Sequence, residues 1–384
     1  MGINRIRLVL TGMALASVAW AVAMPAQSEV TVGVVLGATG PAASISIPYG
    51  NVYQIVPRTV GGQPARFIIL DDTGNPSEAV KHARRLVSED KVDVILGSTY
   101  TPACLAMADV ALESKTPMIC MSPTVVSAEK HPWFFTIPQR LPVMIGGIVG
   151  HMQASGVKTV GFIGFTDGWG DLTLAALEQT AAPAGIKVVA RERYQRNETS
   201  VTAQVLKVMA ANPDAVFVGA SGTPAALPQV TLVERGYKGR IYQTHGAINK
   251  DFLRVGGKNV EGAIAPTGPL VVADQLPDSN PIKKVSLQFF KMYDAAYPAD
   301  ARNPFGGYAY DGYLFLSAGV VSAARKAKPG TPEFRAALRE GMENLKEVVG
   351  THAVYNTSPS DHNGADERAR VMVTVQGGSW KLLQ

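Results

Sequence analysis

Short apolar runs alternate with longer amphipathic stretches along the first third of the chain. Four of these runs are typical of buried parallel strands, namely Val30–Leu36, Arg66–Asp71, Val92–Leu96 and Thr116–Met121. Pro76–Glu89 carries its apolar residues on one side, which predicts a helix. This alternation of strand and helix favours a mostly parallel, doubly wound sheet flanked by helices, which is an α/β fold.

The same alternation returns further along the chain. Apolar strands are expected at Lys158–Gly164, Ile186–Tyr194, Asp214–Val218 and Arg240–Thr244. The segment Pro132–Arg140 interrupts the rhythm, and we place a first crossing between two lobes there. The pattern therefore predicts two Rossmann-like lobes, each built on its own sheet.

The expected lobes divide the chain unequally. Lobe one takes residues 29–140 and 246–350, which include Asn259–Val272, and lobe two takes residues 141–245 and 351–384. The last part of lobe two is a predicted hairpin that turns at Gly377-Gly378. The chain then crosses between the lobes three times, and such a three-segment hinge leaves a cleft that can open and close.

Polar residues follow the strand that ends at Leu96. The loop Ser98–Tyr100 comes next, and Thr101-Pro102 is typical of a helix start. Ser122–Thr124 follows the neighbouring strand. Ligands of open α/β sheets bind outside the carboxyl ends of the strands, where the free N–H groups of a helix start also favour an anion. These loops therefore predict a site for a small anionic molecule.

A similar corner occurs downstream. Gly219–Ala225 matches Gly97–Ala103 in its Gly, Thr, Pro and Ala positions, and each loop carries a serine. Two similar lobes would produce such a repeat. Thr-Pro is also a common way to start a helix, so coincidence remains an alternative explanation.

Residues 1–28 are typical of a secretory signal peptide. Arg5 and Arg7 form its charged start, Leu8–Ala23 is apolar, and small residues suitable for cleavage follow. A retained membrane anchor is the alternative, but the apolar run is short for a span. We expect an exported protein of the periplasm.

Charge argues against nucleic acid as a partner. The 384 residues carry a formal net charge of +5. Removing residues 1–28, which contain two arginines and no acidic residue, leaves 34 basic and 31 acidic residues, or +3. No dense tract of Lys and Arg is present, so the surplus is typical of a solvated surface.

The two cysteines lie on adjacent predicted elements. Cys104 is at the start of the helix after the Ser98–Tyr100 loop, and Cys120 ends the next strand. An exported compartment permits a disulfide between them. Because sequence alone does not fix the geometry that a disulfide needs, we expect two buried free thiols.

Motifs of catalysis and cofactor binding are absent from the sequence. We find no GxSxG, HExxH, P-loop or GxGxxG pattern, and the six histidines have no metal-ligand spacing. Asp71 and Asp72 are adjacent on a strand and point to opposite faces, so they do not form a carboxylate pair. We expect no enzyme activity, no metal and no cofactor.

Several segments, taken in order, resemble one family. The leader, GATGPAAS, VDVILGSTYTPA, PMICMSPT, TDGWG and MVT…GGSWKL are together similar to the periplasmic solute-binding proteins of branched-chain (hydrophobic) amino acid ABC transporters. The resemblance covers essentially the whole chain after the leader. It implies the type I periplasmic binding protein fold, a monomer, capture of a small molecule between closing lobes, and delivery to an inner-membrane ABC permease.

The resemblance also implies which residues hold the ligand. The family binds a ligand carboxylate with hydroxyl and N–H groups of two lobe-one loops, and lobe two closes over it with an aromatic side chain and a further loop. The corresponding residues are Ser98, Thr99, Tyr100, Ser122, Thr124 and Val125 in lobe one, and Trp169, Ser221, Thr223 and His245 in lobe two.

His245 departs from the family pattern. Amino-acid binders place an acidic residue there to hold the ligand's ammonium, and a neutral histidine cannot supply that charge. A carboxylate without an ammonium, such as an aromatic acid, therefore fits better, with Phe305 and Tyr308 as flat apolar walls. Core packing is an equal alternative for these two residues, and a strand-end histidine bonded to backbone is the alternative for His245.

Other ligands and roles stay open. Asp167 can replace the missing acid, so a branched-chain amino acid binding protein is one alternative. A ligand-sensing module on the same fold is another.

Overall fold

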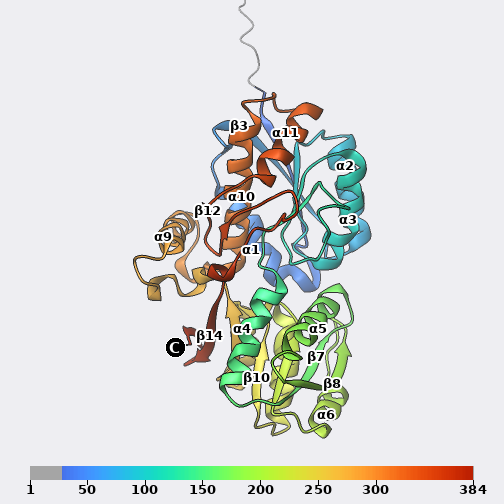
Figure 1. Ribbon diagram of the computed structural model, residues 1–384, viewed down its shortest axis with the longest axis vertical. Helices are drawn as coiled ribbons and strands as arrows, with labels where there is room; N and C mark the ends of the chain where they lie inside the picture. The colour runs from blue at the N-terminus through green and yellow to red at the C-terminus, as the bar shows by residue number, and fades with distance from the viewer. Residues whose placement is uncertain (1–27, 384) are drawn as a thin grey trace, which may run out of the picture.

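The computed structural model describes residues 28–383, and the predicted leader, apart from Ser28, lies outside them. The described chain forms two lobes, one above the other in Figure 1, each built on a sheet with helices on both faces. Among the described residues, no helix is both long and apolar enough to cross a membrane.

The first sheet has six strands in the order β2-β3-β1-β4-β5-β6. All its pairings are parallel except that of β2 with β3. Its strands are β1 (Val30–Leu36), β2 (Thr59–Val60), β3 (Gln63–Asp71), β4 (Val94–Gly97), β5 (Met118–Cys120) and β6 (Phe134–Thr136). Its helices are α1 (Ala43–Ile55), α2 (Pro76–Ser88), α3 (Thr101–Ser114), α9 (Pro281–Asp294), α10 (Pro304–Ala323) and α11 (Pro332–Glu343).

β1 shows why this lobe holds together. Every residue of β1 is buried, because strands lie on both sides and helices on both faces. Val34 packs in the core shared with α1 and α10, whereas its neighbour Val35 packs in the core shared with α2 and α3. Gly33 allows α2 to approach closely, since a Cβ there would lie 2.8 Å from Leu86 Cδ1.

The second sheet has seven strands in the order β15-β14-β11-β10-β9-β7-β8. The strands from β11 to β8 are parallel, and β14 and β15 form an antiparallel hairpin at the edge. They are β7 (Thr159–Phe165), β8 (Lys187–Tyr194), β9 (Ala215–Gly219), β10 (Arg240–Gln243), β11 (Ile264–Thr267), β14 (Val371–Gln376) and β15 (Ser379–Leu382). The helices are α4 (Leu141–Ala154), α5 (Gly168–Ala181), α6 (Thr202–Ala210), α7 (Ala226–Glu234) and α8 (Lys250–Gly256).

Short elements complete the fold. The strands β12 (Val348–Val349) and β13 (Val354–Tyr355) pair with each other. The 3-10 helices are η1 (Gly40–Ala42), η2 (Thr223–Ala225), η3 (His245–Ala247), η4 (Gly257–Val260), η5 (Pro269–Gln275, with a kink at Val272), η6 (Ala299–Ala301) and η7 (Glu367–Ala369).

Two assignments of segments to lobes differ from those expected from the sequence. β11 lies inside Asn259–Val272, which was expected in lobe one, but it pairs with β10 and β14 of the second sheet. Residues 351–369 were expected in lobe two. Tyr355, Ala365 and Ala369 instead pack in the core of lobe one, so only the hairpin β14–β15 returns to lobe two.

The reason for both differences is tertiary. β11 is short and fully buried, and its position beside β10 completes the parallel part of the second sheet. The chain thus passes from lobe one to lobe two between β6 and α4, returns after β11, and passes again before β14. Figure 1 shows β14 descending from the upper lobe to the lower one.

Candidate ligand-binding site

A cavity lies between the two lobes, and the space within it, part of which is open to the solvent, is about 440 Å³. It is lined from lobe one by residues at the starts of α1, α3 and α10 and by the loop after β5, and from lobe two by the loops after β7, β8, β9 and β10. The lining residues are Ala42, Ile45, Tyr49, Thr99, Tyr100, Thr101, Met121, Ser122, Pro123, Pro138, Trp169, Arg196, Ser221, His245, Gly246, Phe305 and Tyr308.

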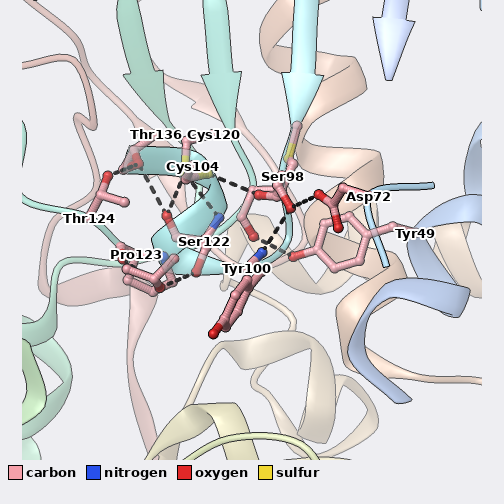
Figure 2. Close-up of a disulfide and its surroundings, with 12 residues drawn as sticks. Tyr49, Asp72, Ser98, Tyr100, Cys104, Cys120, Ser122, Pro123, Thr124 and Thr136 are labelled. Carbon is pink, nitrogen blue, oxygen red and sulfur yellow. Dashed lines mark hydrogen bonds between the residues drawn. A yellow bond between two sulfur atoms is a disulfide. The ribbon is translucent and has the colours of Figure 1, made fainter. Parts of the chain in front are cut away.

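Ser98 shapes the lobe-one loop from behind the cavity. Its buried hydroxyl donates to Asp72 Oδ2 at 2.6 Å and accepts from the N–H of Tyr100 at 3.2 Å, as Figure 2 shows. Burial raises the pKa of the Asp72 carboxyl, while the bonds from Ser98 and Gly74 oppose that rise. Ser98 therefore positions Thr99 and Tyr100 and does not itself line the cavity.

Three hydroxyls of lobe one face the cavity from the start of α3 and the end of β5. Thr101 Oγ1 lies 2.6 Å from Ser122 Oγ, and Thr99 bonds to Ser46. α3 begins at Thr101 with Pro102 in its first turn, and Tyr100 makes no side-chain cap. Its first N–H groups therefore have no partner within the helix, and together with the hydroxyls they form a site suited to a carboxylate.

Cys104 and Cys120 form a disulfide, so the expectation of two free thiols was wrong. The first turn of α3 packs beside the end of β5, which brings the two Cα atoms to 5.9 Å, within the range of disulfides. Figure 2 shows this bond directly behind the loops that carry Ser98 and Ser122. The disulfide therefore ties together the two lobe-one loops that line the cavity.

Thr124, Val125 and Thr223 were predicted to bind the ligand but lie outside the cavity. Thr124 Oγ1 lies 3.1 Å from Thr136 Oγ1 of β6, and Val125 is 74% exposed. Both residues line a separate pocket that also includes Arg140 and Gln179. The N–H of Thr223 donates across the lobes to Ser44 Oγ at 3.3 Å. These residues shape or close the cleft edge instead of lining it.

Trp169 enters the cavity from the first turn of α5. Asp167 caps this helix, because its Oδ1 accepts from the N–H groups of Trp169 at 3.0 Å and Gly170 at 3.3 Å. The indole is almost fully buried at 3% exposed. Its ring meets that of His245 edge to face, with 5.6 Å between the ring centroids.

His245 begins η3, directly after β10, and is 5% exposed. Burial lowers the pKa of its imidazole to about 3, with a smaller contribution from His352, so the ring is neutral at physiological pH. Neither ring nitrogen has a hydrogen-bond partner. The backbone-bonded histidine considered from the sequence is therefore not what the structure shows.

Arg196 is the charged lining residue that the sequence interpretation missed. Its guanidinium donates to Asp167 Oδ2 at 2.6 Å and to Ser221 Oγ at 3.0 Å. Its side chain, only 11% exposed, lies over the rings of Tyr100 at 4.6 Å and Phe165 at 4.1 Å. The signal was its position just after the carboxyl end of β8, on the edge of the sheet where ligands bind.

Tyr100 joins the lobes across the cleft. Its hydroxyl donates to Asp167 Oδ2 of lobe two at 3.3 Å, while its ring lies under Arg196. Burial raises the pKa of this phenol. The lobes thus touch directly, and the structure shows a closed cleft.

Phe305 and Tyr308 belong to the first turns of α10 and line the cavity. Asn303 caps the helix by accepting from the N–H of Phe305 at 3.0 Å. Tyr308 donates to Gln139 Oε1 at 2.7 Å and stacks on His352 with 3.9 Å between centroids. Tyr308 is therefore held rigidly as a flat wall.

The cavity contains one charged side chain. Arg196 is the only basic residue among the lining residues, and none of them is Asp or Glu. Within residues 28–383, no cluster of His, Cys, Asp or Glu is arranged to hold a metal ion. The chemistry of the cavity is thus that of neutral hydroxyls, aromatic rings and one paired cation.

The comparison with known families agrees with this architecture. The family model described as "Periplasmic binding protein" matches residues 29–379. The chain belongs to the periplasmic binding protein family. The predicted family and the type I fold are thereby confirmed, and the protein is a solute-binding protein of the kind that serves ABC transporters in the periplasm. The family binds solutes and is not a family of enzymes.

Individual relatives support the assignment at different strengths. An extracellular ligand-binding receptor from Rhodopseudomonas palustris is 43% identical, with a TM-score of 0.90 and coverage of 93% of this chain and 99% of that one. The Leu/Ile/Val-binding protein homolog 3 of Brucella melitensis is 24% identical over 88% of this chain and 91% of its own length.

A third relative shares the fold alone. It is a solute-binding protein of an R. palustris ABC transporter, solved in complex with 4-hydroxybenzoate. It is 18% identical, with a TM-score of 0.77 and coverage of 93% of this chain and 97% of that one.

Proposed function

We propose that this protein is the substrate-binding component of an ABC importer for a small carboxylate that lacks an ammonium group, specifically an aromatic acid. The ligand binds in the cavity between the lobes, and hinge closure presents it to an inner-membrane permease. The observation that carries this proposal is the absence of any Asp or Glu among the residues that line the cavity.

An α-amino acid would bring a buried ammonium into this cavity. Leaving such a charge without a partner costs several kcal/mol. His245 is neutral and cannot compensate it. Asp167, the other candidate, is already bonded to Arg196 and caps α5, so its charge is used.

The carboxylate of the ligand has a suitable site in lobe one. The free N–H groups at the start of α3 lie beside the hydroxyls of Thr99, Thr101 and Ser122. An anion there gains both hydrogen bonds and the favourable end of the helix dipole.

Flat side chains favour an aromatic body for the ligand. Trp169, Phe305 and Tyr308 line the cavity and are each at least 95% buried. Rings of this kind gain contact area by stacking on or meeting the edges of a planar ligand.

A second candidate function is binding of branched-chain amino acids. The name of the Brucella melitensis relative favours it, and Ile45 and Met121 give the cavity an aliphatic part. The lining contains no acidic residue, so this function requires some other group to pair with the ligand's ammonium.

Ligand pairs that differ only in the ammonium separate the two functions. We expect isothermal titration calorimetry to show that 3-phenylpropionate binds at least about tenfold more tightly than phenylalanine, and 4-methylpentanoate more tightly than leucine. The reason is the cost of an unpaired buried ammonium, and a tenfold difference in affinity corresponds to about 1.4 kcal/mol. Tighter binding of the amino acid in both pairs would overturn the proposal in favour of the second function. Analysis of the recovered ligand for turnover tests the absence of catalysis.

A further inference from the structure

We infer that Trp169 and His245 form a second polar subsite, which binds an oxygen of the ligand other than its carboxylate. The natural ligand is then a hydroxy- or oxo-substituted aromatic acid. This inference rests on the proposed function and names the class of acid more closely.

Unsatisfied polar atoms at the lobe-two side of the cavity carry the inference. Trp169 Nε1, His245 Nδ1 and His245 Nε2 are buried and have no hydrogen-bond partner. Both side chains line the cavity and are more than nine-tenths buried, at 3% and 5% exposed. A buried donor or acceptor without a partner is costly, so a partner from the ligand would be strongly favoured.

The local packing holds these two rings together. Gly246 makes their approach possible, because a Cβ there would lie 3.1 Å from Trp169 Cζ2 and 2.6 Å from Ser221 Cβ. Asp167 fixes the start of α5 from which Trp169 projects. The subsite is therefore built by the fold of lobe two, and it lines the same cavity as the lobe-one hydroxyls that suit the carboxylate.

The donor set determines which group fits. An indole N–H can only donate, so it requires an acceptor. A neutral imidazole offers one donor and one acceptor, and burial keeps His245 neutral. A hydroxyl or a carbonyl oxygen satisfies this pair of rings. A second carboxylate does not, because Arg196 is the only cation in the lining and Asp167 already pairs with it.

The test uses matched ligands on the full-length protein. Calorimetry compares benzoate with 4-hydroxybenzoate, and phenylacetate with its α-hydroxy and α-oxo analogues. We expect at least one oxygen-bearing acid to bind about tenfold more tightly than its parent, which is the gain from a well-made buried hydrogen bond. The α-hydroxy and α-oxo arms distinguish a hydroxyl from a carbonyl.

Two variants locate the effect. Trp169→Phe keeps a ring but removes the N–H, and we expect the ratio of affinities between the substituted acid and its parent to fall to about one. Trp380→Phe removes an indole N–H that is also unpaired but lies on β15, outside the cavity, and should leave the ratio unchanged.

The outcomes separate this inference from the function on which it rests. If the parent acids bind and no added oxygen improves affinity, the subsite is overturned while the proposed function stands. If an oxygen improves affinity equally in wild type and Trp169→Phe, the subsite is also overturned. If 3-phenylpropionate and 4-methylpentanoate do not bind but phenylalanine and leucine do, the proposed function itself fails.

Discussion

Single residues decide the charge of this cleft. His245 is a neutral residue just after the end of β10, and Arg196 pairs with Asp167, the carboxylate considered from the sequence as a partner for an ammonium. The neutral charge of His245 and the pairing of Arg196 with Asp167 are both local and do not depend on the net charge of the lobe. The proposed specificity against an ammonium therefore rests on two side chains that follow two different strands, His245 after β10 and Arg196 after β8.

Replacement of His245 by an acid should shift this specificity. In His245→Glu, a carboxylate enters the cavity near the ligand, where it repels an anionic ligand and can pair with an ammonium. We expect affinity for 3-phenylpropionate to fall at least about tenfold and the preference over phenylalanine to narrow, by calorimetry. His245→Gln is the matched neutral control. Equal affinities in Glu and Gln variants would show that this position does not face the ligand.

The same residue makes a pH prediction. The pKa of His245 is about 3 in the folded protein, against about 6.5 in an unfolded chain. The unfolded chain therefore binds more protons between these values, so stability is full above pH 6.5 and is lost as the pH falls. Between pH 6 and pH 4 the free energy of unfolding should fall with decreasing pH less steeply in His245→Gln than in wild type. We expect the difference between the two slopes to be about 1 kcal/mol per pH unit.

Other buried groups do not disturb that comparison. Burial lowers the pKa of His352 to about 4 and raises that of Asp311 to about 6, and these two groups affect stability in opposite directions. Both are present in wild type and variant. Urea unfolding at several pH values measures the difference, and identical slopes would contradict a buried neutral His245.

At the scale of elements, the site depends on how strand ends and helix starts are joined. β4 leads into α3, β5 lies beside it, and the disulfide between Cys104 and Cys120 holds the two together. The two loops that suit the carboxylate cannot then separate without breaking a covalent bond. A short strand of three residues, β5, thereby gains a fixed position.

Removal of this disulfide should weaken both stability and binding. The double variant Cys104→Ser/Cys120→Ser is expected to lose about 3 kcal/mol of unfolding free energy, the usual effect of opening a loop of this length. Urea unfolding with and without reductant measures the loss in wild type, and the variant should not respond to reductant. A wild-type midpoint that reductant leaves unchanged would contradict the prediction.

The sequence predicted most elements because their patterns are local. Apolar runs and helix starts such as Thr101-Pro102 are visible without knowing the fold. β11 was placed in the wrong lobe, because Ile264–Thr267 is short and its partners, β10 and β14, come from distant parts of the chain. The sequence of these four residues does not indicate which of the two sheets the strand joins.

Residues that act across the cleft were predicted less well for the same reason. Arg196 lies 96 positions from Tyr100 in the chain, and no local motif marks it. Thr124 and Val125 were predicted from the family resemblance, yet they line a different pocket from the one that holds Trp169 and His245. Trp169 was predicted from the family resemblance, because the TDGWG segment that carries it is one of the segments that match the family.

At the scale of the whole molecule, the two lobes are held closed by direct contacts. Tyr100 of lobe one meets Asp167 and Arg196 of lobe two, and Ser44 accepts a bond from Thr223. Tyr100 and Arg196 line the cavity on one side and an outer pocket on the other. They therefore form a wall between the cavity and the solvent.

Weakening this wall should speed release of the ligand. Arg196→Lys keeps the charge but loses the planar group that lies over Tyr100 and the fork that reaches both Asp167 and Ser221. We expect the dissociation rate to rise about tenfold with a smaller change in the association rate, by stopped-flow fluorescence. Arg191→Lys, in an exposed ion pair on β8, the strand that precedes Arg196, is the control. A changed association rate with an unchanged dissociation rate would contradict this role.

The crossings of the chain between the lobes also limit the order in which the lobes can fold. Lobe one needs residues as late as Ala369 for its core, and the second sheet is finished only by the hairpin β14–β15. Neither lobe can therefore complete its folding before these later segments have been synthesised. Both lobes are thus completed only by segments near the C-terminus of the chain, so neither is a continuous stretch that could be cut out and studied alone.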